Sequence, residues 1–162
     1  MIDDAIDHVS VRFMEEKDIK QILLIEQCSF SAPWTSKAYL SELQNKFARY
    51  FVLLDQERVI GYAGMWLFAG ESHITTIAVH PDYRSRRYGR LLMVTLIEHS
   101  MKHNIGTMVL EVRVSNNAAI RLYHSLGFKK IGMRRNYYKE TREDAIVMLR
   151  HLKEGNETGG ME

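Results

Sequence analysis

The segment 77–90 constrains the fold more than any other, because an apolar strand there runs into a turn and an arginine-bearing loop that opens a helix. The first backbone N–H groups of a helix lack intrahelical partners and carry a partial positive charge, so they stabilise an anion. Four arginines add forked donors that match phosphate oxygens, namely Arg84, Arg86, Arg87 and Arg90. The pattern predicts a phosphate-binding loop, with a solvated basic turn or a nucleic-acid patch as the alternative interpretations.

Length and composition fit one globular domain. The chain has 162 residues, of which 46% are hydrophobic and 26% are charged. The net charge of +2 is small, so anion binding is expected to be local to the arginine loop, without bulk affinity for nucleic acid. The single cysteine, Cys28, excludes an internal disulfide, and we expect it to be a buried helix residue rather than a nucleophile. No apolar run is long enough to span a membrane and no leader pattern is evident, so we expect a cytoplasmic protein.

Hydrophobic periodicity predicts an α/β fold in the order β-α-α-β-β-β-α-β-α-β-β. The predicted strands are residues 9–14, 50–54, 58–68, 72–79, 108–114, 128–133 and 145–149. The predicted helices begin near Ile19, after an N-cap at Thr35, after the arginine loop, and at Asn116, the last being closed by Gly127. Residues 1–8 and 151–162 are expected to be disordered tails on a domain at 9–150.

A histidine pair raises the question of a metal site. His99 and His103 are four residues apart and would share one helix face, as metal ligands do. No third ligand and no zinc-protease glutamate accompany them, and cations near a helix C-terminus are stabilised by its dipole. We therefore expect no metal.

Five ordered segments carry a family resemblance. They read Phe-Ser-Ala-Pro-Trp at 30–34, Arg-Ser-Arg-Arg-Tyr-Gly at 84–89, Leu-Glu-Val-Arg-Val-Ser-Asn at 110–116, Leu-Tyr-His-Ser-Leu-Gly-Phe at 122–128 and Arg-Asn-Tyr-Tyr at 135–138. On these segments the chain resembles the GNAT family of acetyl-CoA-dependent N-acetyltransferases, most closely the RimI type, which acetylates the N-terminal alanine of a small-subunit ribosomal protein. The resemblance implies the GNAT fold, a mixed and mostly antiparallel central sheet flanked by helices.

The resemblance also implies where acetyl-CoA binds. The backbone of a splayed strand and the loop after it would hold the coenzyme, together with the start of a later helix. The residues concerned are Ile77, Ala78, Val79, Arg84, Ser85, Arg86, Arg87, Tyr88, Gly89, Arg90 and Asn116. Asn116 would cap its helix as well. Arg87 stands where the family loop has its first glycine, a departure that is costly only if the backbone needs a positive φ or the phosphate approaches Cα closely.

Acetyl transfer to an amine needs a neutral nucleophile, stabilisation of a developing oxyanion and an acid for the thiolate. Glu111 stands at an inner position of an apolar strand, where an ionised carboxylate needs a partner such as Arg113 or backbone donors. A rim salt bridge is the alternative. The resemblance makes Glu111 the proton acceptor, directly or through water. It makes Tyr123 the proton donor to the thiolate, with an ordinary core tyrosine as the alternative.

The acceptor site implied by the resemblance contains Trp34, Tyr137 and Tyr138, although the two tyrosines alone would read as exposed edge-strand aromatics. The resemblance implies acetylation of a protein N-terminus, that of a ribosomal protein. Amine chemistry also favours an N-terminus over a lysine, because an α-amine with a pKa of about 7.7 to 8 is neutral far more often than a lysine at about 10.4. A lysine or small-amine (polyamine, aminoglycoside) acetyltransferase of the same fold is one alternative. A non-catalytic acyl-CoA sensor or ribosome-binding module is another, against which Glu111 and Tyr123 argue. Neither a membrane nor a nucleic acid is an expected partner.

Overall fold

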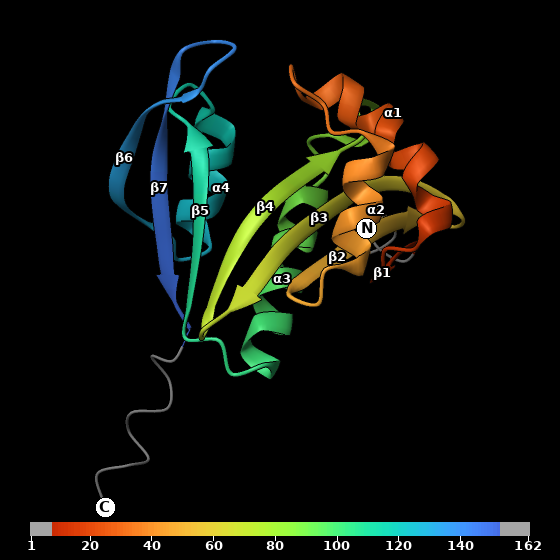
Figure 1. The fold of residues 1–162 in the computed structure, drawn as a ribbon, viewed down its shortest axis with the longest axis horizontal. Helices are drawn as coiled ribbons and strands as arrows, with labels where there is room; N and C mark the ends of the chain where they lie inside the picture. The colour runs from red at the N-terminus through yellow and green to blue at the C-terminus, as the bar shows by residue number, and fades with distance from the viewer. Residues whose placement is uncertain (1–7, 153–162) are drawn as a thin grey trace, which may run out of the picture. The chain divides into compact units, whose positions relative to one another are not determined.

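The computed structural model describes residues 8–152 (Figure 1). The strands follow the order β1-β2-β3-β4-β5-β7-β6 in one mixed, mostly antiparallel sheet. The chain groups into two compact units. Unit 1 comprises Met1–Trp66 and Thr75–Glu98, and unit 2 comprises Leu67–Ile74 and His99–Glu162. The predicted order of helices and strands is confirmed, with two short 3₁₀ helices in addition.

The elements of unit 1 lie at the start of the chain and around the arginine loop. They are β1 (Val9–Phe13), η2 (Glu16–Asp18), α1 (Ile19–Ser29), α2 (Ser36–Gln44), β2 (Ala48–Asp55), β3 (Arg58–Phe68), β4 (Glu71–Val79), η3 (Pro81–Tyr83) and α3 (Tyr88–Lys102), of which β3, β4 and α3 continue into unit 2. Thr35 caps α2 as predicted, because its Oγ1 accepts a hydrogen bond from Ala38 N at 3.2 Å.

Neighbouring residues on β3 show how unit 1 is layered. The ring of Tyr62 meets that of Tyr39 on α2 edge-on, with centroids 6.1 Å apart. A Cβ at Gly61 would lie 3.3 Å from Leu92 Cδ1 on α3. Because successive strand residues point to opposite faces, α2 covers one face of β3 and α3 covers the other (Figure 1).

An ion pair joins β1 to the start of α1. The two terminal nitrogens of Arg12 lie 2.7 and 2.8 Å from the carboxylate oxygens of Asp18, which also accepts a hydrogen bond from Glu15 N at 2.8 Å. Burial of Asp18 disfavours its charged form, but the hydrogen bonds from Arg12 and Glu15 outweigh burial and lower the pKa of Asp18.

Unit 2 is built on three strands and a helix. They are β5 (Thr107–Arg113), α4 (Asn117–Ser125), β6 (Lys129–Tyr138) and β7 (Glu143–His151). The start of β4 pairs with β5 in parallel, and β7 pairs with both β5 and β6 in antiparallel. Met108, Leu110 and Val112 of β5 are buried and alternate with less buried residues, so the strand has one core face. Gly127 ends the α4 turn with φ +90°, which confirms its predicted left-handed conformation.

Some expectations need correction. Cys28 lies on α1 as expected but is exposed, because the buried stripe of this helix is formed by other residues, namely Ile19, Ile22, Ile25 and Glu26. β6 (Lys129–Tyr138) and β7 (Glu143–His151) are longer than the predicted strands at 128–133 and 145–149. The pairing of β6 with β7 contains two register shifts, which interrupt the regular alternation of side chains along β6.

The expected tails, 1–8 and 151–162, lie outside the described residues apart from His8, His151 and Leu152. His151 ends β7, and Leu152 N donates a hydrogen bond to Gly106 O at 2.8 Å. No helix within residues 8–152 is long and apolar enough to cross a membrane.

Candidate active site

The predicted phosphate-binding loop of unit 1 joins η3 to α3. Ser85 and Arg87 have φ values of +63° and +66°. The first-glycine position of the family loop therefore does need a positive φ, and a side chain there costs roughly 1–2 kcal/mol. The residues 84–87 are exposed and stand immediately before the first turn of α3, so their backbone and basic side chains suit a pyrophosphate.

Two loop arginines are held against unit 1. Arg84 donates hydrogen bonds from Nε to Val79 O at 3.1 Å and from Nη2 to Ser29 Oγ at 3.2 Å. Arg86 places its guanidinium 5.5 Å from the centroid of the Tyr83 ring. Arg84 thus ties the loop to the ends of β4 and α1.

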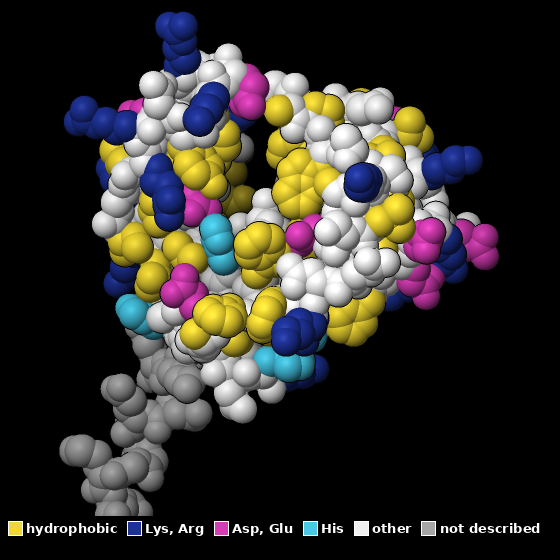
Figure 2. Space-filling model, viewed as in Figure 1, with side chains coloured by type: hydrophobic (Ala, Val, Ile, Leu, Met, Phe, Trp, Pro, Cys, Tyr) yellow, Lys and Arg dark blue, Asp and Glu magenta, His cyan; other side chains and the backbone are white. Residues whose placement is uncertain are grey.

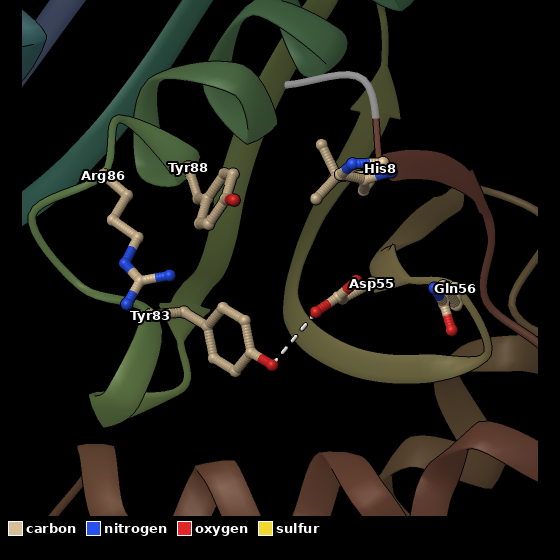
Figure 3. A pocket seen from close by; sticks show the side chains of 7 residues that line it. His8, Asp55, Gln56, Tyr83, Arg86 and Tyr88 are labelled. Carbon is tan, nitrogen blue, oxygen red and sulfur yellow. Dashed lines mark hydrogen bonds between the residues drawn. The ribbon is translucent and has the colours of Figure 1, made fainter. Parts of the chain in front are cut away.

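A pocket of about 300 Å³ lies beside this loop (Figure 3). It is lined by His8, Val9, Asp55, Gln56, Tyr83, Arg86 and Tyr88. Tyr83 donates its hydroxyl hydrogen to Asp55 Oδ2 at 3.1 Å across the pocket. Tyr88 is buried here, so its side chain packs within unit 1. Tyr88 is also the first residue of α3, so its backbone N–H is one of those at the start of the helix. Along β4, Ala78 is buried whereas Ile77 and Val79 are only half-buried.

Unit 2 contains a charged group around Glu111, which we name the Glu111 cluster and define as Glu111, His73, Arg134, Tyr137 and Tyr138. The Glu111 side chain is only 7% exposed; its Oε2 lies 2.6 Å from His73 Nε2 and its Oε1 lies 3.6 Å from Arg134 Nε. Figure 2 shows basic, acidic and histidine side chains next to one another over the strands of this unit. The carboxylate thus has the partners that a buried charge requires.

Arg113, one of the two kinds of partner considered for Glu111, has other partners in the structure. Arg113 donates a hydrogen bond to Thr141 Oγ1 at 2.6 Å, lies 3.8 Å from Glu143 and stacks 4.0 Å from the Tyr138 ring centroid. His73 and Arg134, on β4 and β6, hold Glu111 instead. One signal in the sequence points to His73, a lone histidine in a predicted strand, but no local pattern pairs that residue with Glu111.

Electrostatic interactions link His73 and the tyrosines of the cluster to Glu111. The hydrogen bond to Glu111 raises the pKa of His73, against the opposing effect of burial. Burial raises the pKa of Tyr137, and the charge of Glu111 adds to that rise. Burial, with Tyr137 as the next contribution, raises the pKa of Tyr138 to about 12. The two tyrosines meet edge-on with centroids 5.1 Å apart, and both are protonated at neutral pH.

Tyr123 lies on α4, and Asn116 is the N-cap of this helix. Burial raises the pKa of Tyr123 to about 12, with a smaller contribution from Tyr138, so its phenol keeps its proton at neutral pH and can donate it. Its ring meets that of Phe128 at 6.2 Å. Asn116 caps α4 as predicted, because its Oδ1 accepts a hydrogen bond from Ala119 N at 3.2 Å.

Trp34 lies between α1 and α2 in unit 1. Its backbone N donates a hydrogen bond to Glu26 Oε2 at 2.8 Å, and its exposed ring lies 5.3 Å from that of Tyr39. Unit 1 therefore carries the arginine loop and Trp34, while unit 2 brings Glu111 together with Tyr137 and Tyr138.

The histidine pair that raised the metal question lies at the end of α3. The two rings stack 4.1 Å apart, and His103 Nδ1 lies 2.8 Å from His99 O. Within residues 8–152, no three or more histidine, cysteine, aspartate or glutamate side chains are grouped so as to hold a metal ion.

Comparison with known proteins decides the family. The model of the acetyltransferase (GNAT) family matches residues 19–128. The chain belongs to this family. A putative [ribosomal protein bS18]-alanine N-acetyltransferase of Bacillus subtilis is 37% identical over 140 residues, which cover 86% of this chain and 93% of the relative. The Escherichia coli K12 [ribosomal protein bS18]-alanine N-acetyltransferase is 38% identical over 141 residues, covering 86% and 95%.

Solved structures agree with this assignment. The crystal structure of the Escherichia coli ribosomal-protein-S18-alanine N-acetyltransferase has a TM-score of 0.82 at 36% identity, with 89% of this chain and 94% of that chain covered. Ard1 of Thermoplasma volcanium has a TM-score of 0.83 at 26% identity, with 90% and 98% covered. The predicted GNAT fold is confirmed, and the protein is an N-acetyltransferase of a family that uses acetyl-CoA.

Proposed function

We propose that this GNAT N-acetyltransferase transfers the acetyl group of acetyl-CoA to the N-terminal α-amine of a protein, the N-terminal alanine of a ribosomal protein, in the cytoplasm. The observation that carries the proposal is the Glu111 cluster, a nearly buried carboxylate bordered by two protonated tyrosines on one sheet. The printed activity of the Bacillus and Escherichia relatives, similar over 86% of this chain, supports an N-terminal alanine as the acceptor.

The arginine loop holds the diphosphate of the cosubstrate in this proposal. Its exposed basic side chains and the partial positive charge at the start of α3 favour an anion. The contributing residues are Ile77, Ala78, Val79, Arg84, Ser85, Arg86, Arg87, Tyr88, Gly89, Arg90 and Asn116. Asn116 caps α4 through its side chain and would contribute a second polar contact.

Glu111 and Tyr123 carry the proton transfers. Glu111 receives one proton from the α-ammonium, directly or through water, which leaves an electron pair on nitrogen. That pair forms the bond to the acetyl carbon while the C–S bond breaks and sulfur keeps its electron pair. Tyr123 protonates the thiolate, and the remaining surplus proton on nitrogen returns to the phenolate through solvent. The products are the amide, the thiol and one proton released.

Aromatic side chains contact the acceptor in this proposal: exposed Trp34 in unit 1, and exposed Tyr137 and half-buried Tyr138 in unit 2. Trp34 is fixed by its backbone bond to Glu26, and Tyr137 and Tyr138 stand on β6 near Glu111. Flat rings that bury area at little entropic cost suit the first residues of an extended peptide.

Mass spectrometry of a peptide panel tests the proposal. Peptides with a free N-terminal alanine and an internal lysine are incubated with acetyl-CoA beside the same peptides with a blocked N-terminus. We expect acetylation of the α-amine and none of the blocked peptides. Acetylation of lysine in both sets of peptides would replace the proposed acceptor with a lysine side chain. Acetylation of a polyamine or aminoglycoside alone would replace it with a small amine. Coenzyme binding without any turnover would favour a non-catalytic acyl-CoA sensor.

A further inference from the structure

His73 lies on β4 where this strand pairs with β5. In the parallel register His73 is opposite Val109, and Glu111 is two residues further along β5, so the three side chains stand on one face. His73 Nε2 lies 2.6 Å from Glu111 Oε2, slightly shorter than is usual for a charge-assisted hydrogen bond from nitrogen to a carboxylate. A histidine and a carboxylate in this arrangement form a dyad.

The two members of the dyad differ in accessibility. The side chain of His73 is 38% exposed, whereas that of Glu111 is 7% exposed and has Arg134 beside its second oxygen. A molecule arriving from solvent therefore reaches the imidazole more readily than the carboxylate. When Nε2 carries the hydrogen donated to Glu111, the lone pair of the neutral ring is on Nδ1, which can accept a proton.

Charges on three strands act on the ring. Glu111 on β5 raises the pKa of His73, first through its hydrogen bond and then through its charge. Burial and Arg134 on β6 lower that pKa, and Glu71 on β4 raises it by a smaller amount. The net rise moves the pKa of the imidazole toward that of an α-amine, which is about 7.7 to 8. An ordinary carboxylate, with a pKa of about 4.3, is much further from that value. Proton transfer near neutral pH is most efficient between groups so matched.

We propose that His73, in place of Glu111 itself, takes the proton of the acceptor amine and that Glu111 acts through His73, an inference that rests on the proposed acetyl transfer. One N–H bond of the α-ammonium breaks, its electron pair stays on nitrogen, and the proton forms a bond to His73 Nδ1. Glu111 keeps its hydrogen bond to Nε2–H and stabilises the resulting imidazolium. The imidazolium then releases the proton to solvent, so the dyad ends each cycle unchanged.

His73→Gln tests this role, because its amide can still donate to Glu111 but cannot titrate. We expect kcat/KM to fall by about 10²-fold, and the acidic limb of the pH profile set by His73 to disappear. His103→Gln, at an exposed histidine just after the end of α3, is the matched control and should keep both the rate and the profile. Because paired groups are non-additive, His73→Gln combined with Glu111→Gln should lose no more than the worse single variant.

Histidine NMR gives a readout independent of turnover. The titration of His73 in the intact protein should lie above the ordinary range, and in Glu111→Gln it should move to lower pH because the carboxylate is gone. An unchanged titration would overturn the dyad, as would His73→Gln with the wild-type rate and profile and an unchanged thermal unfolding curve. The peptide panel separates the two proposals, because the amine that is acetylated is identified whether or not His73 carries its proton.

Discussion

Glu26 Oε2 accepts a hydrogen bond from the backbone N of Trp34 at 2.8 Å, so a buried carboxylate on α1 fixes the segment between α1 and α2. Its Oε1 accepts from the hydroxyls of Tyr39 at 2.7 Å and Tyr62 at 2.5 Å. Three donors from three parts of unit 1 thus converge on one side chain, which satisfies the buried charge and sets where Trp34 stands.

Glu26→Gln should destabilise the protein and weaken acceptor binding. The amide cannot accept from all three donors, so at least one buried donor loses its partner, at a cost of roughly 1–3 kcal/mol. Denaturant unfolding should show this loss, and kinetics should show a raised KM for the acceptor peptide. Glu57→Gln in the exposed β2–β3 turn should change neither quantity. Equal effects of the two variants would mean that Glu26 does not position Trp34.

Arg87→Gly should stabilise the loop or leave it unchanged, and should keep coenzyme binding and activity. Arginine at φ +66° is strained, whereas glycine adopts this conformation without steric cost. Arg86→Gly is the comparison variant, since its φ is not positive, so glycine there relieves no strain, adds backbone freedom and removes the side chain that lies over Tyr83. Thermal unfolding should give a higher melting temperature for Arg87→Gly than for Arg86→Gly, and calorimetric titration should give a higher affinity for coenzyme A. The reverse order would contradict the strain argument.

Tyr123→Phe should slow turnover by about 10²- to 10³-fold while coenzyme affinity stays nearly unchanged, because the variant removes one positioned acid and little volume. With a pKa of about 12, the Tyr123 phenol stays protonated across the neutral and mildly alkaline range, so its own titration should not limit the rate below about pH 11. Steady-state kinetics with a calorimetric binding control measure both quantities. Unchanged turnover in Tyr123→Phe would mean that Tyr123 is only a packing residue of unit 2.

Asp18→Asn should lower stability at neutral pH and matter less in acid. The pKa of Asp18 is lowered in the folded state, so its contribution is present above its unfolded-state pKa and is lost as pH falls through the folded-state pKa. Chemical denaturation from pH 7 down to about pH 2.5 should show wild type and variant converging at the acid end. Asp82→Asn, whose side chain is exposed, should follow the wild type at every pH.

Local chemistry in the sequence was sufficient to predict the elements and the loop. Thr35, Asn116 and Gly127 each act on backbone within a few residues, so capping rules located three helix ends. The strand, loop and helix of segment 77–90 follow from hydrophobic periodicity in the same way.

Only the tertiary structure decided the partners. His73 and Glu111 are 38 residues apart and meet because β4 and β5 pair in a particular parallel register, which no local pattern specifies. The same holds for Arg134, which reaches Glu111 from β6, while Arg113, the nearest candidate in sequence, pairs with Glu143. The positive φ at Arg87 and the exposure of Cys28 could not be predicted from the sequence either. Packing against distant residues sets the path of the backbone and determines which side of a helix faces the core.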